Sequence, residues 1–325
     1  MSTPCILVIG ANGQIGTELV EALAKRHGAQ SVVSSDISPQ ASTPTRLLGV
    51  RHAALDATDA AALRNVVERF SVTQVYLLAA ALSARGEQHP MWAWDLNMKS
   101  LLNVLELARS HALRVFWPSS IAAFGPSSPK LLTPQATVMD PSSVYGISKL
   151  AGEGWCAWYH RNHDVDVRSL RYPGLISWKT PPGGGTTDYA VEIFHAALQT
   201  GHYTSFLAAD TALPMMYMPD AIRATLELMD APGESIHQRG AYNLAGVSFT
   251  PAQIAHAIAQ QLPGFHVDYA PDYRQAIAGS WPQSIDDSEA RKDWGWSAQF
   301  DLDALVHDML AHLRPVLAAA PRLAA

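Results

Sequence analysis

The first half of the chain alternates short apolar runs with longer segments in which apolar residues recur at helical spacing. This alternation predicts strands at residues 5–9, 31–35, 49–53, 74–79, 114–118 and 165–171, and helices at residues 13–27, 59–70, 91–111 and 142–163. Several of the strands are continuously apolar, which is typical of strands buried on both faces of a parallel sheet. The pattern therefore predicts an α/β fold with a doubly wound parallel sheet.

The pattern changes after Pro173. A loop rich in proline and glycine at residues 181–187 is followed by shorter elements. We expect helices at residues 188–200, 220–229 and 251–261, with Thr250 as an N-cap before Pro251, and strands at residues 215–218, 242–244 and 266–269. Residues 1–173 are predicted to form one domain and residues 174–325 mainly a smaller α/β lobe, with some of the later chain crossing back.

Composition narrows the partner to a small molecule. The 325 residues are 48% hydrophobic, and 23 basic against 29 acidic residues give a net charge of −6, which disfavours nucleic acid or an anionic membrane as partner. Cys5 and Cys156 cannot build a disulfide framework. The sequence also contains no apolar run of about 20 residues that would span a bilayer and no charged signal-peptide start. We expect a cytoplasmic protein.

A glycine motif follows the first predicted strand. Gly10, Gly13 and Gly16 follow that strand and open the helix at 13–27. Glycines at this spacing permit a tight turn, close approach of a pyrophosphate to the helix N-terminus, and close helix–strand packing. Asp36 ends the second strand, where a carboxylate can bind both ribose hydroxyls and repel a 2′-phosphate. These residues predict a Rossmann-type domain that binds NAD rather than NADP.

Three later residues carry candidate chemistry. Tyr145 and Lys149 are four apart in a predicted helix and so share one face. A lysine ammonium near the phenol lowers its pKa, so Tyr145 could take a proton from a substrate hydroxyl as hydride leaves the same carbon. Ser120 follows the strand at 114–118, at the edge of the sheet where ligands bind, and could orient that hydroxyl.

These signals in this order resemble the extended short-chain dehydrogenase/reductase family, which includes the UDP-galactose 4-epimerases. The resemblance covers nearly the whole chain. It implies that Asp56 binds the adenine amino group, that Asn97 lies behind the cofactor, and that the segment ending at Gly174 closes on nicotinamide. The cofactor contacts implied in addition to the glycines, Asp36, Tyr145 and Lys149 are Gln14, Ile15, Asp56, Ala57, Leu78, Ala79, Ala80, Asn97, Tyr172, Gly174 and Leu175.

Segments of the second half narrow the resemblance. Several segments are similar to the short-chain type of L-threonine 3-dehydrogenase: residues 172–177, 183–190, 213–218, 280–282, 285–288, 290–291 and 293–296. That similarity implies oxidation of L-threonine at C3 to 2-amino-3-ketobutyrate, with Tyr145 as base, Lys149 lowering its pKa and Ser120 positioning the hydroxyl. Substrate contacts are expected from Ser83, Ser120, Tyr145, Thr186 and Trp281. The glycines at 183–185 would act as a lid, and helices 91–111 and 142–163 would form a four-helix homodimer interface.

Two other interpretations stay open at this point, and a third is disfavoured. A nucleotide-sugar 4-epimerase shares the fold, whereas a dehydratase would usually carry Asp and Glu where Ile121 and Ala122 stand. A non-catalytic NAD-binding protein would be expected to have lost Tyr145 or Lys149. A zinc-dependent threonine dehydrogenase needs clustered ligands, and the helical pair His160 and His163 has no cysteine or carboxylate set to complete it. No metal is expected.

Overall fold

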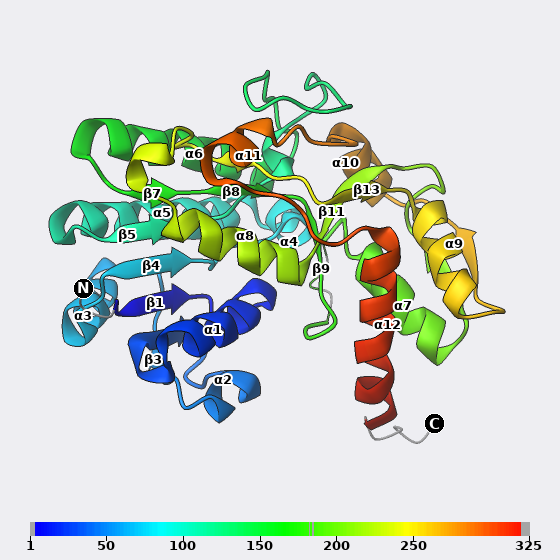
Figure 1. Cartoon of the computed structure of the whole chain (residues 1–325). Coiled ribbons are helices and arrows are strands. Elements are labelled where there is room, and N and C mark those ends of the chain that lie inside the picture. The colour runs from blue at the N-terminus through cyan, green and yellow to red at the C-terminus, as the bar shows by residue number, and fades with distance from the viewer. Residues whose placement is uncertain (1–3, 182, 184, 320–325) are drawn as a thin grey trace.

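A six-stranded parallel sheet forms the centre of the molecule (Figure 1). The computed structural model describes residues 4–181, 183 and 185–319. Within them the strand order is β3-β2-β1-β4-β5-β7, and every neighbouring pair is parallel. The strands are β1 (Ile6–Ile9), β2 (Val32–Asp36), β3 (Arg51–Ala54), β4 (Gln74–Leu77), β5 (Arg114–Phe116) and β7 (Val167–Arg168). The prediction of a doubly wound Rossmann sheet is confirmed.

Helices cover both faces of this sheet because alternate side chains of each strand point to opposite sides. Ile6 and Val8 of β1 pack in one apolar core with Leu19 of helix α1. Leu7 and Ile9 pack in the other, with Leu101 of α5 among their companions. The helices of this half are α1 (Gln14–His27), α2 (Thr43–Leu47), α3 (Ala60–Phe70), α4 (Ser83–Gln88), α5 (Pro90–His111) and α6 (Val144–His163), with 3-10 turns η1 (Ala29–Ser31) and η2 (Ile121–Ala123).

The rest of the described chain builds three smaller sheets and further helices. The sheets are β12-β8-β6 (Tyr242–Asn243, Leu170–Tyr172, Ser119–Ser120), β13-β11-β9 (Val247–Phe249, Leu213–Tyr217, Gly174–Ile176) and β10-β14 (His202–Ser205, His266–Tyr269). The helices are α7 (Tyr189–Gln199), α8 (Met218–Asp230), η3 (Gly233–Ser235), α9 (Pro251–Gln261), α10 (Arg274–Ser280), α11 (Ser288–Trp294) and α12 (Leu302–Ala319). In Figure 1, α7, α9 and α12 lie together at the right, around a core of their own.

The predicted elements agree with the observed ones to within two residues at each end, with one exception. The apolar run at 165–171 is not one strand: it breaks at Ser169 into β7 and β8, which belong to different sheets. Thr250 does cap α9, because its hydroxyl accepts from the Gln253 amide (3.2 Å) and the Gln253 side chain accepts in return from the Thr250 amide. Among the described helices, none is long and apolar enough to cross a membrane.

The later chain crosses back onto the first half. Met218 and Ala221 of α8, together with Trp296, pack in the same core as Leu19 of α1. Residues after 173 therefore complete the core beneath the central sheet. The division of the chain into lobes at residue 173 stays a prediction.

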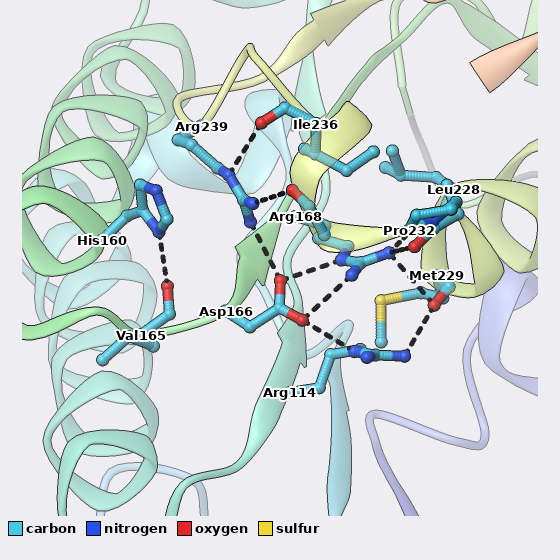
Figure 2. Close-up of polar contacts among 12 residues, drawn as sticks. Arg114, His160, Val165, Asp166, Arg168, Leu228, Met229, Pro232, Ile236 and Arg239 are labelled. Atoms are coloured by element: carbon cyan, nitrogen blue, oxygen red, sulfur yellow. Dashed lines mark hydrogen bonds and ion pairs between the residues drawn. The ribbon is translucent and has the colours of Figure 1, made fainter. Parts of the chain in front are cut away.

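A cluster of charged side chains ties α8 to the edge of the sheet (Figure 2). Asp166 accepts hydrogen bonds from Arg114 Nε (2.8 Å), Arg168 Nε (2.9 Å) and Arg239 Nη1 (2.9 Å). Arg168 is fully buried and donates from Nη1 to the carbonyls of Leu228 (2.7 Å) and Ala231 (2.7 Å), at the end of α8. Burial of Asp166 raises its pKa, but the arginines outweigh this and hold the pKa well below its usual range.

Candidate active site

The glycine motif closes tightly around the end of β1. Gly10 has φ +84°, and a Cβ there would lie 2.6 Å from the Ala79 amide nitrogen. A Cβ on Gly16 would overlap the Gly10 carbonyl oxygen and lie 2.7 Å from Ala11 Cα. Only glycine fits these two positions. The result is a bare backbone turn at the start of α1, the geometry that a pyrophosphate requires.

A cleft of about 1150 Å³ opens beside this turn, at the carboxyl ends of the strands. Asp36 lies on its wall and is fixed there because its carboxylate accepts from the amides of Asn12 (3.1 Å) and Ser38 (3.2 Å). Asp56 also lines the cleft, and hydrogen bonds from Thr58 lower its pKa. The predicted cofactor residues that line this cleft are Gly10, Gly13, Asp36, Asp56, Ala57, Leu78, Ala79 and Ala80.

A smaller cavity of about 170 Å³ adjoins the cleft, since Leu78 and Ala80 line both. The predicted cofactor residues on its wall are Gln14, Ile15, Leu78, Ala80, Tyr145, Lys149, Tyr172, Gly174 and Leu175. The residues predicted to contact the substrate, Ser83, Ser120, Tyr145, Thr186 and Trp281, also line it. They come from both halves of the sequence, and the fold brings them together.

The start of α6 presents Tyr145 and Lys149 to this cavity. The Ser143 hydroxyl caps the helix by accepting from the Gly146 amide (3.0 Å). Lys149 Nζ donates to the Pro118 carbonyl (2.6 Å) and lies 5.3 Å from the centre of the Tyr145 ring. Ser120 lies beside the Tyr145 phenol, close enough to lower its pKa. The serine, tyrosine and lysine predicted as catalytic therefore form one group.

The pKa of Tyr145 differs from the sequence prediction. Lys149 was expected to lower it, but burial of the phenol raises the pKa of Tyr145 to about 12, and the lowering contribution comes from the Ser120 hydrogen bond. The ammonium of Lys149 is directed to the Pro118 carbonyl and lies over the Trp117 ring, 4.6 Å from its centre. Burial lowers the pKa of Lys149 to about 7, whereas Cys156 and Glu153 act in the opposite direction.

Two of the predicted cofactor residues line neither the cleft nor the cavity. Gly16 serves the close packing of the turn described above. The Asn97 side chain is buried behind the wall, where Oδ1 accepts from the Ala81 amide (2.7 Å) and Nδ2 donates to Ser148 Oγ (3.0 Å). Asn97 thus links the segment after β4 to α6. Its contact with a cofactor stays a prediction.

Sequence reasoning missed other residues on these walls. Asp188 and Thr187 line the smaller cavity, and Trp92 and Lys99 of α5 line the larger cleft. The Asp188 carboxylate accepts from the Gly185 amide (2.7 Å), which closes the loop just before α7. Asp188 stands within the segment 183–190 that was singled out, so its acidity in an otherwise uncharged segment was the available signal.

The loop that carries Thr186 is fastened at its base to α1. Ser177 Oγ donates to Glu18, which is buried, and Lys179 Nζ pairs with Glu21 (2.6 Å). Trp178 stacks on His312 of α12, with ring centres 4.6 Å apart. Of the glycines predicted to act as a lid, Gly184 lies outside the described residues. The lid itself stays a prediction.

The histidine pair considered for zinc has other contacts. His160 Nδ1 lies 3.1 Å from the Val165 carbonyl (Figure 2), and the His163 ring packs edge-on against Trp158. Over the part of the chain that the structure describes, no three His, Cys, Asp or Glu side chains are grouped so that they could hold a metal ion.

Comparisons with known proteins show the family to which this chain belongs. Residues 6–245 match the NAD dependent epimerase/dehydratase family. An uncharacterized epimerase/dehydratase of Staphylococcus saprophyticus is 47% identical over 94% of this chain and 95% of its own. The holo form of a GalE-like L-threonine dehydrogenase from Cupriavidus necator is 66% identical, with a TM-score of 0.93 over 95% of this chain and 100% of that chain.

More distant solved structures carry the same description. L-threonine dehydrogenase from Clostridium difficile is 42% identical, with a TM-score of 0.94 over 97% of this chain and 99% of that chain. A monomeric L-threonine 3-dehydrogenase from a metagenome is 46% identical, with a TM-score of 0.91 over 96% and 99%. The resemblance predicted from the motifs is thus confirmed, and the chain belongs to the NAD-dependent epimerase/dehydratase family of enzymes.

Proposed function

We propose that this protein is an NAD-dependent L-threonine 3-dehydrogenase that oxidises the 3-hydroxyl group of L-threonine to give 2-amino-3-ketobutyrate. One observation carries the proposal: a tyrosine, a serine and a buried lysine line a small cavity that adjoins a dinucleotide-sized cleft. The 66% identity to a solved L-threonine dehydrogenase supports the choice of substrate.

The larger cleft fits NAD. The side-chain-free turn at Gly10 and Gly16 leaves room for a pyrophosphate at the start of α1, and Asp36 would bind the adenosine ribose. Its negative charge disfavours the 2′-phosphate of NADP. When bound, NAD⁺ would supply the hydride acceptor for the hydrogen on C3.

The side chains around the smaller cavity divide the remaining work. Ser120 would hold the substrate hydroxyl against Tyr145, and the phenolate oxygen of Tyr145 would take its proton. A positive charge on Lys149, whose Nζ lies 5.3 Å from the centre of the tyrosine ring, would favour that phenolate, whereas burial raises the pKa of Tyr145. Ser120 therefore orients, Tyr145 moves the proton, and Lys149 makes the proton acceptor available.

The cavity also suits the amino-acid part of the substrate. Ser83, Thr186 and Trp281 lie on its walls, and the carboxylate of Asp188 could pair with an ammonium group. The space of about 170 Å³ suits a small amino acid. No feature of these walls favours the 4-epimerase alternative. The expected reaction, a cytoplasmic location and the absence of a catalytic metal remain parts of the proposal.

The deciding assay follows NADH absorbance with L-threonine and NAD⁺ in the presence of a metal chelator. We expect chelator-resistant turnover of L-threonine, and little with D-threonine, L-allo-threonine or L-serine. UDP-galactose is assayed in parallel as the substrate expected for the epimerase alternative. Folded protein that binds NAD⁺ but oxidises none of these amino acids would contradict the proposal, and would favour the epimerase or the non-catalytic alternative.

We also propose a homodimer through α5 and α6. Trp94, Trp155 and Trp158 are exposed by 36–39% on the single chain, and the last two pack edge to face with ring centres 5.8 Å apart. Exposed aromatic residues grouped on one face are typical of a protein interface. Sedimentation of wild type and Trp158→Asp tests this: a dimer that the variant converts to monomer is expected, and a wild-type monomer would contradict it.

A further inference from the structure

A buried carboxylate lies one helical turn beyond Lys149. Glu153 of α6 is only 5% exposed, and both of its carboxylate oxygens accept hydrogen bonds. Oε1 accepts from the Ser119 hydroxyl (2.6 Å) and from Arg171 Nε (2.9 Å), while Oε2 accepts from Arg171 Nη2 (2.8 Å). Glu153 does not line the cavity, so the reaction proposed above gives it no direct part.

Its partner Arg171 extends the connection into the second half of the chain. From β8, Arg171 Nη1 donates to the Asn243 side-chain oxygen (2.9 Å) and to the Gln135 carbonyl (2.9 Å). Asn243 Nδ2 in turn donates to the carbonyls of Thr133 (3.0 Å) and Asp286 (3.0 Å). The ion pair thus joins α6, β6, β8 and β12 to the segment that follows Trp281.

Stability is a weak reason for placing charges there. Removing two charges from water is costly, and apolar residues of similar volume often serve a fold equally well. What the pair does provide is fixed geometry. Ser119 directly precedes Ser120, and Pro118, whose carbonyl receives the Lys149 ammonium, directly precedes Ser119. One carboxylate therefore sets the distance between the helix that carries Tyr145 and the strand that carries Ser120.

We infer that Glu153 is a positioning residue, which holds β6 and its Ser120 hydroxyl in register with Tyr145 and Lys149, and that the fork of Arg171 locks it in place. The inference rests on the proposed function, because it assigns these two residues to the same reaction. It adds a second layer of residues on which the catalytic group depends.

The same carboxylate acts on Lys149 electrostatically. Burial lowers the pKa of Lys149, whereas Cys156 and Glu153 of the same helix raise it. The rings of Trp117 and Tyr145 also lie near the ammonium. Removing the charge of Glu153 lowers the pKa of Lys149 further. The lysine is charged below its pKa, so the charge that favours the phenolate is then lost at a lower pH.

Three variants separate geometry from charge. Glu153→Gln removes the charge but keeps an acceptor for Ser119, Arg171→Lys keeps a charge but loses the fork, and Ser119→Ala removes a single hydrogen bond. We expect kcat for L-threonine to fall in each, by about 10²-fold in Glu153→Gln and Arg171→Lys because a small misplacement has this effect. The KM for NAD⁺ should change less than about twofold, since the cleft is untouched.

The pH dependence of kcat/KM gives a second readout. The alkaline limb should move to lower pH in Glu153→Gln and stay in place in Arg171→Lys and Ser119→Ala. The matched control is Asp166→Asn, which breaks another arginine–carboxylate cluster away from the cavity (Figure 2). It should lower the unfolding temperature with kcat and the alkaline limb unchanged. If Glu153→Gln behaves like this control, the inference is wrong.

Hydrogen exchange tests the same point without turnover. Ser119 and Ser120 pair with Arg171 and Tyr172 across β6 and β8, and the Ala122 amide donates to Ser120 Oγ (3.1 Å). Amide exchange over residues 119–124 should be faster in Glu153→Gln than in wild type and unchanged in Asp166→Asn. Wild type that binds NAD⁺ but does not oxidise L-threonine would overturn the proposed function alone, whereas unchanged exchange in Glu153→Gln would overturn the positioning role.

Discussion

Replacing Asp166 with asparagine should destabilise the protein without changing its site. Asparagine is isosteric, but one of its terminal atoms is an NH₂ group, which faces the N–H groups of Arg114 and Arg168 as a donor against donors. The charge that compensates the fully buried Arg168 guanidinium disappears as well. The end of α8 is then held to the sheet by a buried cation with no counter-ion.

The magnitude follows from that geometry. Removing one partner of a fully buried ion pair costs about 3–5 kcal/mol. Asp166 is 31% exposed, so solvent screens part of this, and we expect a loss of about 2–4 kcal/mol in the free energy of unfolding. With an unfolding entropy of about 2 cal/mol/K per residue, a chain of this length should lose about 3–6 °C in Tm.

The pH dependence has a definite sign. The folded-state pKa of Asp166 is depressed, so its contribution is complete above the unfolded carboxyl pKa of about 3.9 and is lost as the pH falls towards the folded value. The stability difference between wild type and Asp166→Asn should therefore be constant from pH 8 to pH 5 and decrease below about pH 4.

The assay is urea unfolding of both proteins across this pH range, combined with kcat at neutral pH. Arg64→Gln serves as the control, because it removes an exposed ion pair with a 4.0 Å separation and should cost less than about 0.5 kcal/mol. The reasoning fails if Asp166→Asn is as stable as wild type, or if the difference already disappears between pH 7 and pH 5.

Three further changes test the cofactor and catalytic residues. Tyr145→Phe should keep NAD⁺ affinity but lose about 10²-fold or more in turnover, because the proton acceptor is gone; NADH formation and NAD⁺ titration measure the two, and unchanged turnover would refute the role. Asp36→Ala should relax the preference for NAD over NADP in kcat/KM, and an unaltered ratio would count against the ribose contact. Gly16→Ala forces the turn apart and should weaken NAD⁺ binding about tenfold. It should also lower the free energy of unfolding by about 1–3 kcal/mol. Gly279→Ala, where a Cβ meets nothing within 4 Å, should leave the NAD⁺ Kd as it is.

The sequence predicted the elements whose signals are local. Continuous apolar runs located the strands of the central sheet, and glycine spacing located the turn before α1. The two-residue strand β6 has no periodicity of its own and forms because β8 pairs with it. Helix α12 was missed although Leu302, Leu305, Val306, Met309 and Leu313 recur at helical spacing, so that signal was available.

The site residues also divide into those that a local pattern predicts and those that it does not. Spacing alone placed Tyr145 and Lys149 on one helical face, and family resemblance supplied residues as distant as Ser83 and Trp281. The predicted shift in the pKa of Tyr145 was wrong in direction, because the pKa depends on burial, which spacing does not reveal. The Arg171 contact with Asn243 joins residues 72 apart in the chain, and no local pattern predicts such a partner.

Because residues near the end of the chain complete a core of the central sheet, this core can form only late in synthesis. Leu19 and Leu23 of α1 belong to a core that also needs Tyr242 and Trp296. A nascent chain that has emerged through β7 has every strand of the central sheet but lacks the side chains that cover this part of its surface. We therefore expect the cofactor half to stay exposed and prone to aggregation until nearly the whole chain has left the ribosome.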